Sequence, residues 1–317
     1  MMRPLLLWAS TNPYLSRRLP RYGFVRRAVR RFMPGETPEA ALVEAERLRE
    51  RGAPTIVTLL GENIEAESEA RAVVDHYLGV LEDVRRRGLD AEVSVKLTQL
   101  GLDLSPDLAL EGVRTLAKAS RDGPGEEAGE GGRLTLWIDM ESSAYVDRTL
   151  DLFRTVRKDH ENVGVALQAY LLRTENDFES LLPLEPSIRL VKGAYLESPQ
   201  VAYPKKRQVD AAFQRIAKRM LRERKAGRMG RPAIGTHDPR ILGDVTRMAR
   251  ELDLPRDAYE FEMLYGIGTE QQEHLLSQGY VLRVLISYGA AWFPWYMRRL
   301  AERPANLWFV VKQMARG

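Results

Sequence analysis

The chain has 317 residues, of which 44% are hydrophobic and 29% are charged, so it can build one large core and is not a disordered polypeptide. It has no cysteine, which excludes a disulfide, a zinc ribbon, a thiolate-bound cluster and a cysteine nucleophile. The longest apolar run near its start, Leu5 to Ala9, is much shorter than the roughly 20 residues of a membrane span, so we expect a cytoplasmic protein.

The basic character of the chain is concentrated in an N-terminal arm, residues 1–35. The arm holds eight arginines and no acid, and subtracting these charges from the formal net charge of +4 leaves −4 for the rest. A pI of about 9.2 is therefore weak evidence for nucleic acid, and we expect no such partner. The arm is either a solvated helix face or a peripheral contact with anionic lipid or a partner. The second interpretation rests on apolar residues at helical spacing between the arginines: Tyr22, Phe24, Val25, Val29 and Phe32.

Residues 36–317 are predicted to form one domain. Its first helix, Pro38 to Arg51, has Thr37 as N-cap and would cover the lower mouth or an outer face of a barrel. Eight short apolar runs predict strands: Pro54–Leu60, Glu92–Leu97, Leu134–Ile138, Val163–Leu167, Ile188–Val191, Ala233–Gly235, Tyr259–Met263 and Tyr280–Ile286. Each is followed by a predicted helix: Ala66–Arg87, Pro106–Ala119, Ala144–Lys158, Glu175–Leu182, Gln208–Lys225, Pro239–Leu252, Glu270–Ser277 and Pro294–Arg303. This alternation predicts an α/β fold, a closed (β/α)8 barrel.

The active site of such a barrel lies at the carboxyl ends of its strands, and in this chain those ends are polar. They carry Glu62, Lys96, Thr98, Gln99, Asp139, Glu141, Gln168, Lys192, Thr236, His237, Asp238 and Glu262. Lys96, Arg189 and Lys192 put cations into apolar strands, where only a bound anion or a paired acid can compensate them. The alternative is ion pairing for its own sake, for example between Lys96 and Asp139. Four histidines without ligand spacing argue against a metal site.

The last predicted helix carries a second cluster, Arg298, Arg299 and Glu302. Two guanidiniums leaning over the mouth could clamp a carboxylate, whereas on a solvated helix one would face water and the other would pair with an acid. From the residues alone, we infer a small anionic substrate and a phosphate-bearing cofactor near Arg189 and Lys192.

Several blocks in order along the chain carry a family resemblance: VSVKLTQLGLDLS, LWIDME, LQAYLLRTEND, IRLVKGAY, THDPR, FEMLYGIG and RRLAERPANL. They resemble the monofunctional bacterial proline dehydrogenases. The resemblance implies a distorted (β/α)8 barrel with noncovalent FAD. It also implies oxidation of L-proline to Δ1-pyrroline-5-carboxylate, with electrons passed to a membrane quinone. A homo-oligomer and a peripheral position on the inner membrane face are compatible with the sequence.

The resemblance also assigns roles. It implies that Arg298 and Arg299 bind the proline carboxylate, and that Lys96, Asp139 and Glu302 form the charged network beside it. Tyr195 and Leu264 would line the proline ring, and Arg189 would lie by the flavin N5 atom. The cofactor would be held by Met140, Gln168, Lys192, Gly193, Ala194, Thr236 and His237. Of these residues, Lys96, Asp139 and Arg189 are the candidate catalytic set.

Two positions depart from the family pattern. Leu285 stands where the pattern R-x-Y-x-P-Y-G has its second conserved side chain, a tyrosine that packs on the substrate ring. We expect weaker proline binding there and room for a substituted ring such as 4-hydroxyproline. Glu262 stands where a glutamine is usual beside the cofactor, which adds negative charge.

Two alternatives come from other classes. Lys96 or Lys192 at a strand end could serve a Schiff-base aldolase or lyase, which needs no flavin. The arginine-rich arm could instead mark an RNA- or membrane-binding protein built on a degenerate barrel.

Overall fold

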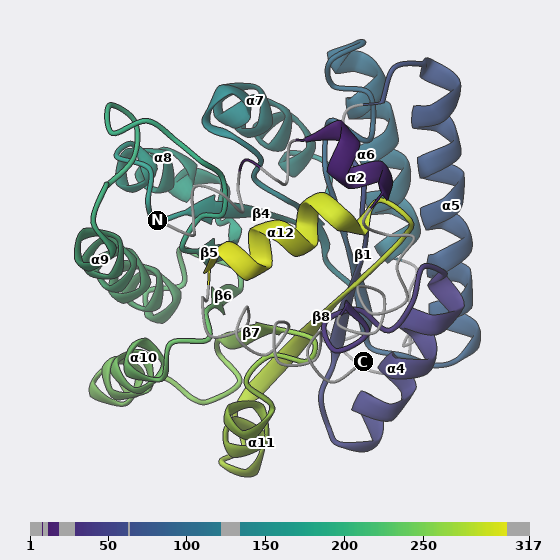
Figure 1. The fold of residues 1–317 in the computed structure, drawn as a ribbon. Coiled ribbons are helices and arrows are strands. Elements are labelled where there is room, and N and C mark those ends of the chain that lie inside the picture. Colours follow the sequence, from purple (N-terminus) through teal and green to yellow (C-terminus); the bar gives the residue numbers. More distant parts are fainter. Residues whose placement is uncertain (1–7, 9–11, 19–28, 63, 122–133, 303–317) are drawn as a thin grey trace.

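The computed structural model describes residues 8, 12–18, 29–62, 64–121 and 134–302. Its centre is a closed barrel in which each strand pairs with the next and β8 pairs with β1, all in parallel (Figure 1). The predicted fold class is confirmed, and every strand lies within two residues of its expected bounds. The strands are β1 (Thr55–Leu59), β2 (Ala91–Val95), β3 (Leu136–Ile138), β4 (Val163–Gln168), β5 (Ser187–Val191), β6 (Pro232–Gly235), β7 (Glu260–Leu264) and β8 (Val281–Tyr288).

Helices surround the barrel because their apolar stripes pack on the outward side chains of the strands. In α6, for example, Val113, Leu116 and Ala117 are fully buried. A 3-10 turn, Ser143–Tyr145, opens the segment expected to start as a helix at Ala144. The ring contains α5 (Glu67–Arg86), α6 (Pro106–Arg121), α7 (Val146–Arg157), α8 (Thr174–Leu181), α9 (Lys206–Lys225), α10 (Pro239–Glu251) and α11 (Thr269–Ser277) (Figure 1).

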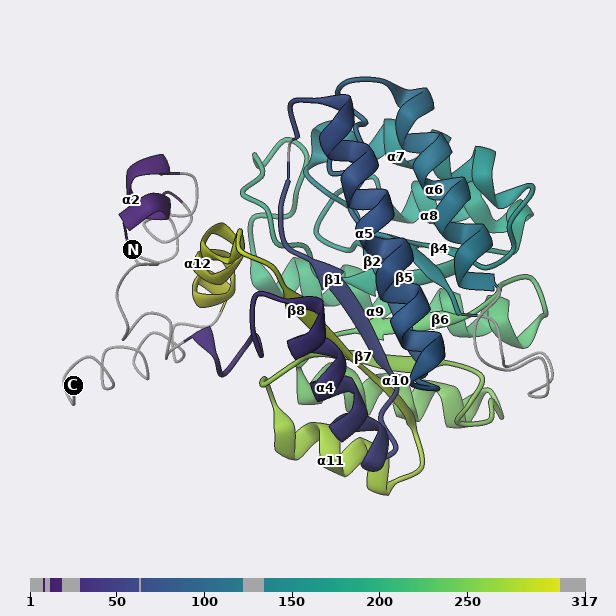
Figure 2. The same cartoon turned by 90° about the vertical axis from the view of Figure 1, so that its right-hand side faces the viewer.

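The helix before the barrel, α4 (Pro38–Glu50), completes this ring. It begins where expected, since the Thr37 hydroxyl accepts a hydrogen bond from the Ala40 amide at 3.3 Å. Its apolar stripe, which includes Leu42, joins the main core, and α4 lies along the outside of β1 and β8 (Figure 2). Of the two positions left open by the sequence, the outer face is the one it occupies.

The helix after β8, α12 (Trp292–Glu302), lies across the carboxyl end of the barrel (Figures 1 and 2). Because α4 fills the eighth outer place, α12 packs elsewhere. Trp292 and Tyr296 form an apolar cluster with Leu60, which follows β1, and with Ile267, which follows β7. The fold therefore places the last predicted helix over the mouth.

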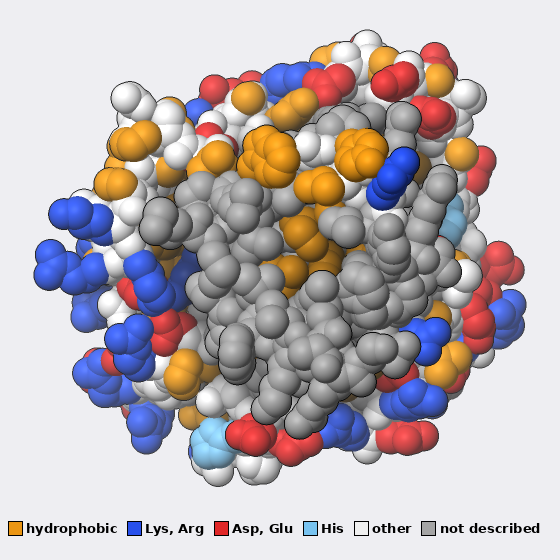
Figure 3. Space-filling model, viewed as in Figure 1, with side chains coloured by type: hydrophobic (Ala, Val, Ile, Leu, Met, Phe, Trp, Pro, Cys, Tyr) orange, Lys and Arg blue, Asp and Glu red, His pale blue; other side chains and the backbone are white. Residues whose placement is uncertain are grey.

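The end of the N-terminal arm packs on α12. Val29, Phe32 and Met33 are buried in the α12 cluster, and the rings of Phe32 and Tyr296 lie 6.0 Å apart. Farther toward the start lies α2 (Pro13–Arg18). The spacing expected for residues 22–25 lies outside the described residues. Seen from the mouth, charged side chains ring the periphery and many of the described hydrophobic ones gather toward the centre and upper part (Figure 3). Within the described ranges, no helix is both long and apolar enough to cross a bilayer.

The amino-terminal end of the barrel interior is filled by ion pairs. Arg231 lies 2.6 Å from Glu92 and 3.3 Å from Glu260. Arg283 lies 3.3 Å from Glu260 and 2.7 Å from Asp90, an exposed residue just before β2. These pairs form the floor of the barrel, and the Trp137 ring lies 5.3 Å from the Arg231 guanidinium.

Trp137 fits inside the barrel only because Gly164 has no side chain, since a Cβ there would lie 2.6 Å from the indole Cε3 atom. We predict that Gly164→Ala lowers the free energy of unfolding by about 1–3 kcal/mol through overpacking. Gly79→Ala, in an exposed turn of α5 with open space around it, should raise it by about 0.5–1 kcal/mol. Urea denaturation of both variants measures the two changes. A Gly164→Ala midpoint equal to that of the wild type would contradict the prediction and show that the indole can move aside.

Candidate active site at the carboxyl ends of the strands

Asp139 is the centre of the charged cluster at the mouth. Its carboxylate accepts a hydrogen bond from Lys96 Nζ at 3.0 Å and another from Arg189 Nη1 at 3.0 Å. The hydroxyl of Ser94 donates to the same carboxylate at 2.6 Å and accepts from Arg189 at 3.0 Å. Side chains from β2 and β5 and from the end of β3 are thus joined across the interior. The pairing considered for Lys96 and Asp139 is present.

Both members of the lysine pair are charged at neutral pH. Burial lowers the pKa of Lys96, but Asp139, with smaller contributions from Tyr77 and Glu62, outweighs burial and leaves that pKa above its usual value. Burial likewise raises the pKa of Asp139, and Lys96 and Arg189 together bring it below its usual value. Lys96 is therefore held as an ammonium ion beside a carboxylate.

Arg189 is held on three sides. Besides Asp139, its Nε atom lies 2.5 Å from a carboxylate oxygen of Glu262, and its Cζ lies 4.5 Å from the Trp137 ring. Only 3% of Arg189 is exposed, and Nη2 has no hydrogen-bond partner among the described residues. Burial raises the pKa of Glu262 to about 8, although Arg189 acts to lower it. A cation with an unused donor is thus fixed beneath the mouth.

A second cationic cluster lies where β5 and β6 end. Lys192 donates to Asp210 at 2.6 Å and to Asp238 at 3.2 Å. Asp238 is also the N-cap of α10, accepting from the Arg240 amide at 3.2 Å. Lys192 follows β5 and keeps 27% of its side chain exposed, so it is less enclosed than the sequence suggested. Lys192 therefore faces the rim, beside a helix N-terminus.

Other predicted cofactor residues line the same rim. Thr236 is buried and accepts from the Asp238 amide at 3.2 Å, and His237 accepts from the Leu264 amide at 3.2 Å. Gln168 donates to the Glu141 carbonyl at 2.8 Å, next to the buried Met140.

The segment after β5 bends sharply at Gly193. Its φ of +111° suits glycine, and a Cβ there would lie 2.2 Å from the Tyr170 ring. Gly193 and the half-buried Ala194 thus bring backbone close to the mouth.

The structure describes the side chains of only some of the predicted substrate residues. The Tyr195 hydroxyl donates to Glu62 at 3.3 Å, and Leu264 packs against the α12 cluster. Leu285 points into the barrel against Ile56 and Trp137. Arg298, Arg299 and Glu302 belong to α12, but their side chains lie outside the described part of the chain.

Two members of this cluster were missed from the sequence, Ser94 and Trp137. Each lies two residues before a predicted site residue, Ser94 before Lys96 and Trp137 before Asp139. Because strand side chains alternate, positions two apart face the same side. That spacing was the signal that could have identified both.

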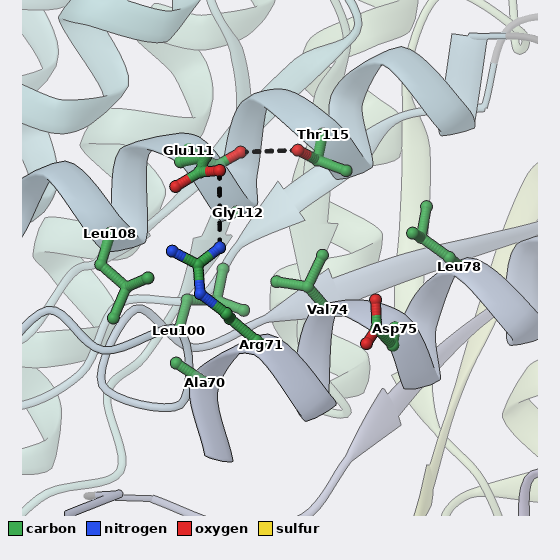
Figure 4. A pocket seen from close by; sticks show the side chains of 10 residues that line it. All are labelled: Ala70, Arg71, Val74, Asp75, Leu78, Leu100, Leu108, Glu111, Gly112 and Thr115. Carbon is green, nitrogen blue, oxygen red and sulfur yellow. Dashed lines mark hydrogen bonds and ion pairs between the residues drawn. The ribbon is translucent and has the colours of Figure 1, made fainter. Parts of the chain in front are cut away.

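A separate hollow lies on the outer surface between α5 and α6 (Figure 4). Arg71 and Glu111 bridge it at 3.6 Å, and Val74 and Leu100 contribute apolar lining. It is on the outside of the barrel, away from the charged mouth, so we do not assign the active site to it.

The fold and the mouth define a barrel enzyme with buried cations at its carboxyl end. Comparison with known proteins makes this specific. The profile of the family described as "Proline dehydrogenase" matches residues 41–312. "Proline dehydrogenase 1" of Bacillus subtilis (strain 168) is 37% identical over 98% of each chain. "Proline dehydrogenase" of Deinococcus radiodurans is 37% identical over 90% of each. The chain belongs to the proline dehydrogenase family.

A solved structure resembles the whole barrel. Proline utilization A from Bdellovibrio bacteriovorus, inactivated by N-propargylglycine, superposes with a TM-score of 0.79 at 24% identity. The match covers 95% of this chain and 36% of that longer one. At this identity the likeness supports the fold, and the enzyme class rests on the family match.

Asp139 neutralises two buried cations, so removing its charge should destabilise the fold. We predict that Asp139→Asn lowers the free energy of unfolding by about 3 kcal/mol, since Lys96 and Arg189 then lose their shared acid. Asp151→Asn, which removes an exposed partner of Arg154, should change it by about 0.5 kcal/mol or less. Chemical denaturation at neutral pH compares the two. Similar losses would mean that the buried cations find other compensation.

Proposed function

We propose that this chain oxidises L-proline to Δ1-pyrroline-5-carboxylate, with noncovalent FAD as the acceptor and a membrane quinone as the next electron carrier. The family match supports the substrate. The assignment of a flavin acceptor rests on the environment of Arg189. This buried cation is fixed by Asp139, Glu262 and Trp137, and one of its donors is unused among the described residues. A positive charge held rigidly where negative charge develops lowers the barrier to that development.

The residues present fit an anionic flavin nucleotide. The unused Arg189 Nη2 offers a hydrogen bond within the barrel. The N-terminus of α10 and the ammonium groups of Lys192 and Lys206 suit phosphate oxygens at the rim. When bound, the flavin supplies a hydride acceptor.

The chain's own residues would orient proline and set its charge. In the proposal, Arg298 and Arg299 bind the carboxylate from α12, with Glu302 completing the network around Lys96 and Asp139. Tyr195 and Leu264 enclose the ring. The ring carbon next to nitrogen gives up a hydride, and the nitrogen lone pair becomes the new C=N bond, so the amine must first lose its extra proton.

The charge on Lys96 argues against the Schiff-base alternative. A lysine that attacks a carbonyl must be neutral, but Asp139 at 3.0 Å keeps the pKa of Lys96 above its usual value. Lys192 is likewise paired with two acids, Asp210 and Asp238.

An anaerobic visible spectrum tests the proposal directly. The purified chain should show flavin bands that bleach on addition of L-proline, at a rate that rises with pH as the substrate amine loses its proton. Arg189→Met should slow bleaching by about 100-fold or more, since it removes the fixed charge. Arg154→Met, at a half-buried arginine on the outer helix α7, is the matched control and should leave the rate unchanged. A chain that binds no flavin after reconstitution with FAD would refute the cofactor assignment.

Leu285 is proposed to set the width of the substrate pocket. We predict that Leu285→Tyr lowers the ratio of kcat/KM for 4-hydroxyproline to that for proline by about tenfold, because the larger ring fills the space beside Trp137. Leu285→Met keeps the volume similar and should leave the ratio near that of the wild type. Steady-state kinetics with both substrates measures it. An unchanged ratio in Leu285→Tyr would place the substituent elsewhere.

A further inference from the structure

Among the described residues, Glu262 is the acid of the barrel interior with the fewest hydrogen bonds. Only 4% of the residue is exposed, and neither carboxylate oxygen has a hydrogen-bond donor among the described residues. Its 2.5 Å approach to Arg189 Nε brings charges together without hydrogen-bond alignment. Asp139, by contrast, accepts hydrogen bonds from three side chains. A buried carboxylate without hydrogen bonds is costly, and taking up a proton removes that cost.

Within the described part of the chain, the charged groups around Glu262 do not supply it with a cation of its own. On the floor, Arg231 is paired with Glu92 and Glu260, and Arg283 with Asp90 and Glu260. Arg283 is also the register neighbour of Glu262 on β8, and Gly235 is the neighbour on β6.

On the mouth side, Glu262 has Arg189, which Asp139 already pairs. Burial raises the pKa of Glu262 to about 8; Arg189 and Arg231 oppose this rise, while Glu260 and Glu92 add to it. Burial and the two neighbouring acids therefore favour the protonated form of Glu262.

We propose that Glu262 is a positioning residue for the reaction whose protonation state decides how much of the Arg189 charge is available to a bound anionic group. With Glu262 protonated, Lys96, Asp139 and Arg189 together carry one net positive charge. With Glu262 ionised, the four side chains sum to zero. This inference rests on the proposed function, since hydride transfer brings one negative charge to the acceptor beside Arg189.

The first test needs no cofactor. Folding raises the pKa of Glu262. Between the ordinary pKa of a glutamate and the raised native value, the native state holds a proton that the unfolded chain has lost. The contribution of Glu262 to stability must therefore fall as the pH rises between these two values. Relative to wild type, the cofactor-free Glu262→Gln chain should therefore gain thermal stability steadily from about pH 5 to about pH 8 and then level off. Parallel melting curves at every pH would overturn the proposal. Infrared spectra of the wild type give a check without a variant, because the carbonyl band of the protonated carboxyl should persist at neutral pH and fade as the pH rises through about 8.

The second test reads the charge on Arg189 without turnover. Sulfite adds to bound flavin more tightly when positive charge lies nearby, and the adduct is seen by loss of the visible band. From about pH 6 to about pH 9, the wild-type dissociation constant for sulfite should rise about tenfold more than that of Glu262→Gln. Sulfite itself also titrates in this range, but this effect is the same for both proteins and cancels in the ratio of their dissociation constants. Glu141→Gln removes another buried acid of the mouth, one bonded to Thr98, and should follow wild type.

The outcomes separate the two proposals. A chain that binds no flavin defeats the proposed function, while the melting curves still judge the proton on Glu262. A chain bleached by proline, with parallel melting curves, keeps the function and overturns the role of Glu262. Melting curves that diverge while sulfite affinities run parallel would place the proton on Glu262 but deny it control of Arg189.

Discussion

The interior of this barrel depends on the rule that a buried cation needs an acid. Lys96 and Arg189 share Asp139 at the mouth, and Arg231 and Arg283 share Glu260 on the floor. An unpaired buried ion costs several kcal/mol, so each of these residues constrains the others. The pairs also link strands that are not backbone neighbours, since Arg189 on β5 contacts side chains of β2 and β7 and Asp139 at the end of β3. The same contacts that compensate charge therefore hold the barrel in shape.

Trp137 divides this charged interior into two layers. Its ring has the Arg189 guanidinium at 4.5 Å and that of Arg231 at 5.3 Å, and its Nε1 atom donates to Glu92 at 2.7 Å. Gly164 leaves the room that the indole needs. A rigid aromatic side chain thus separates the floor from the mouth. The few polar groups above it set the field at the mouth, and Arg189 is held in one orientation before any ligand arrives.

Sequence reasoning located the elements because short apolar runs bounded by turns identify strands locally. It also found Lys96, Asp139 and Arg189, since a charge in an apolar strand is visible without a structure. The ion-pair partners of these buried charges were harder to predict. Arg189 and Glu262 lie on strands that do not neighbour each other, and their contact depends on the stagger of the closed barrel. The position of α12 had no local signal, because it follows from α4 filling the eighth outer place. The roles of Arg298 and Arg299 stay predictions.

Arg189 and Glu262, two buried groups of the mouth with unsatisfied polar atoms, lie next to each other. Arg189 keeps an unused buried donor, and Glu262 beside it has no hydrogen-bond donor among the described residues. Replacing both by apolar side chains of similar volume would satisfy the interior better for the stability of the fold alone. Local rules of burial are broken at functional sites more than elsewhere. In the proposed function this pair is polar capacity kept for a ligand, and a protonated Glu262 leaves the charge of Arg189 to meet a negative charge.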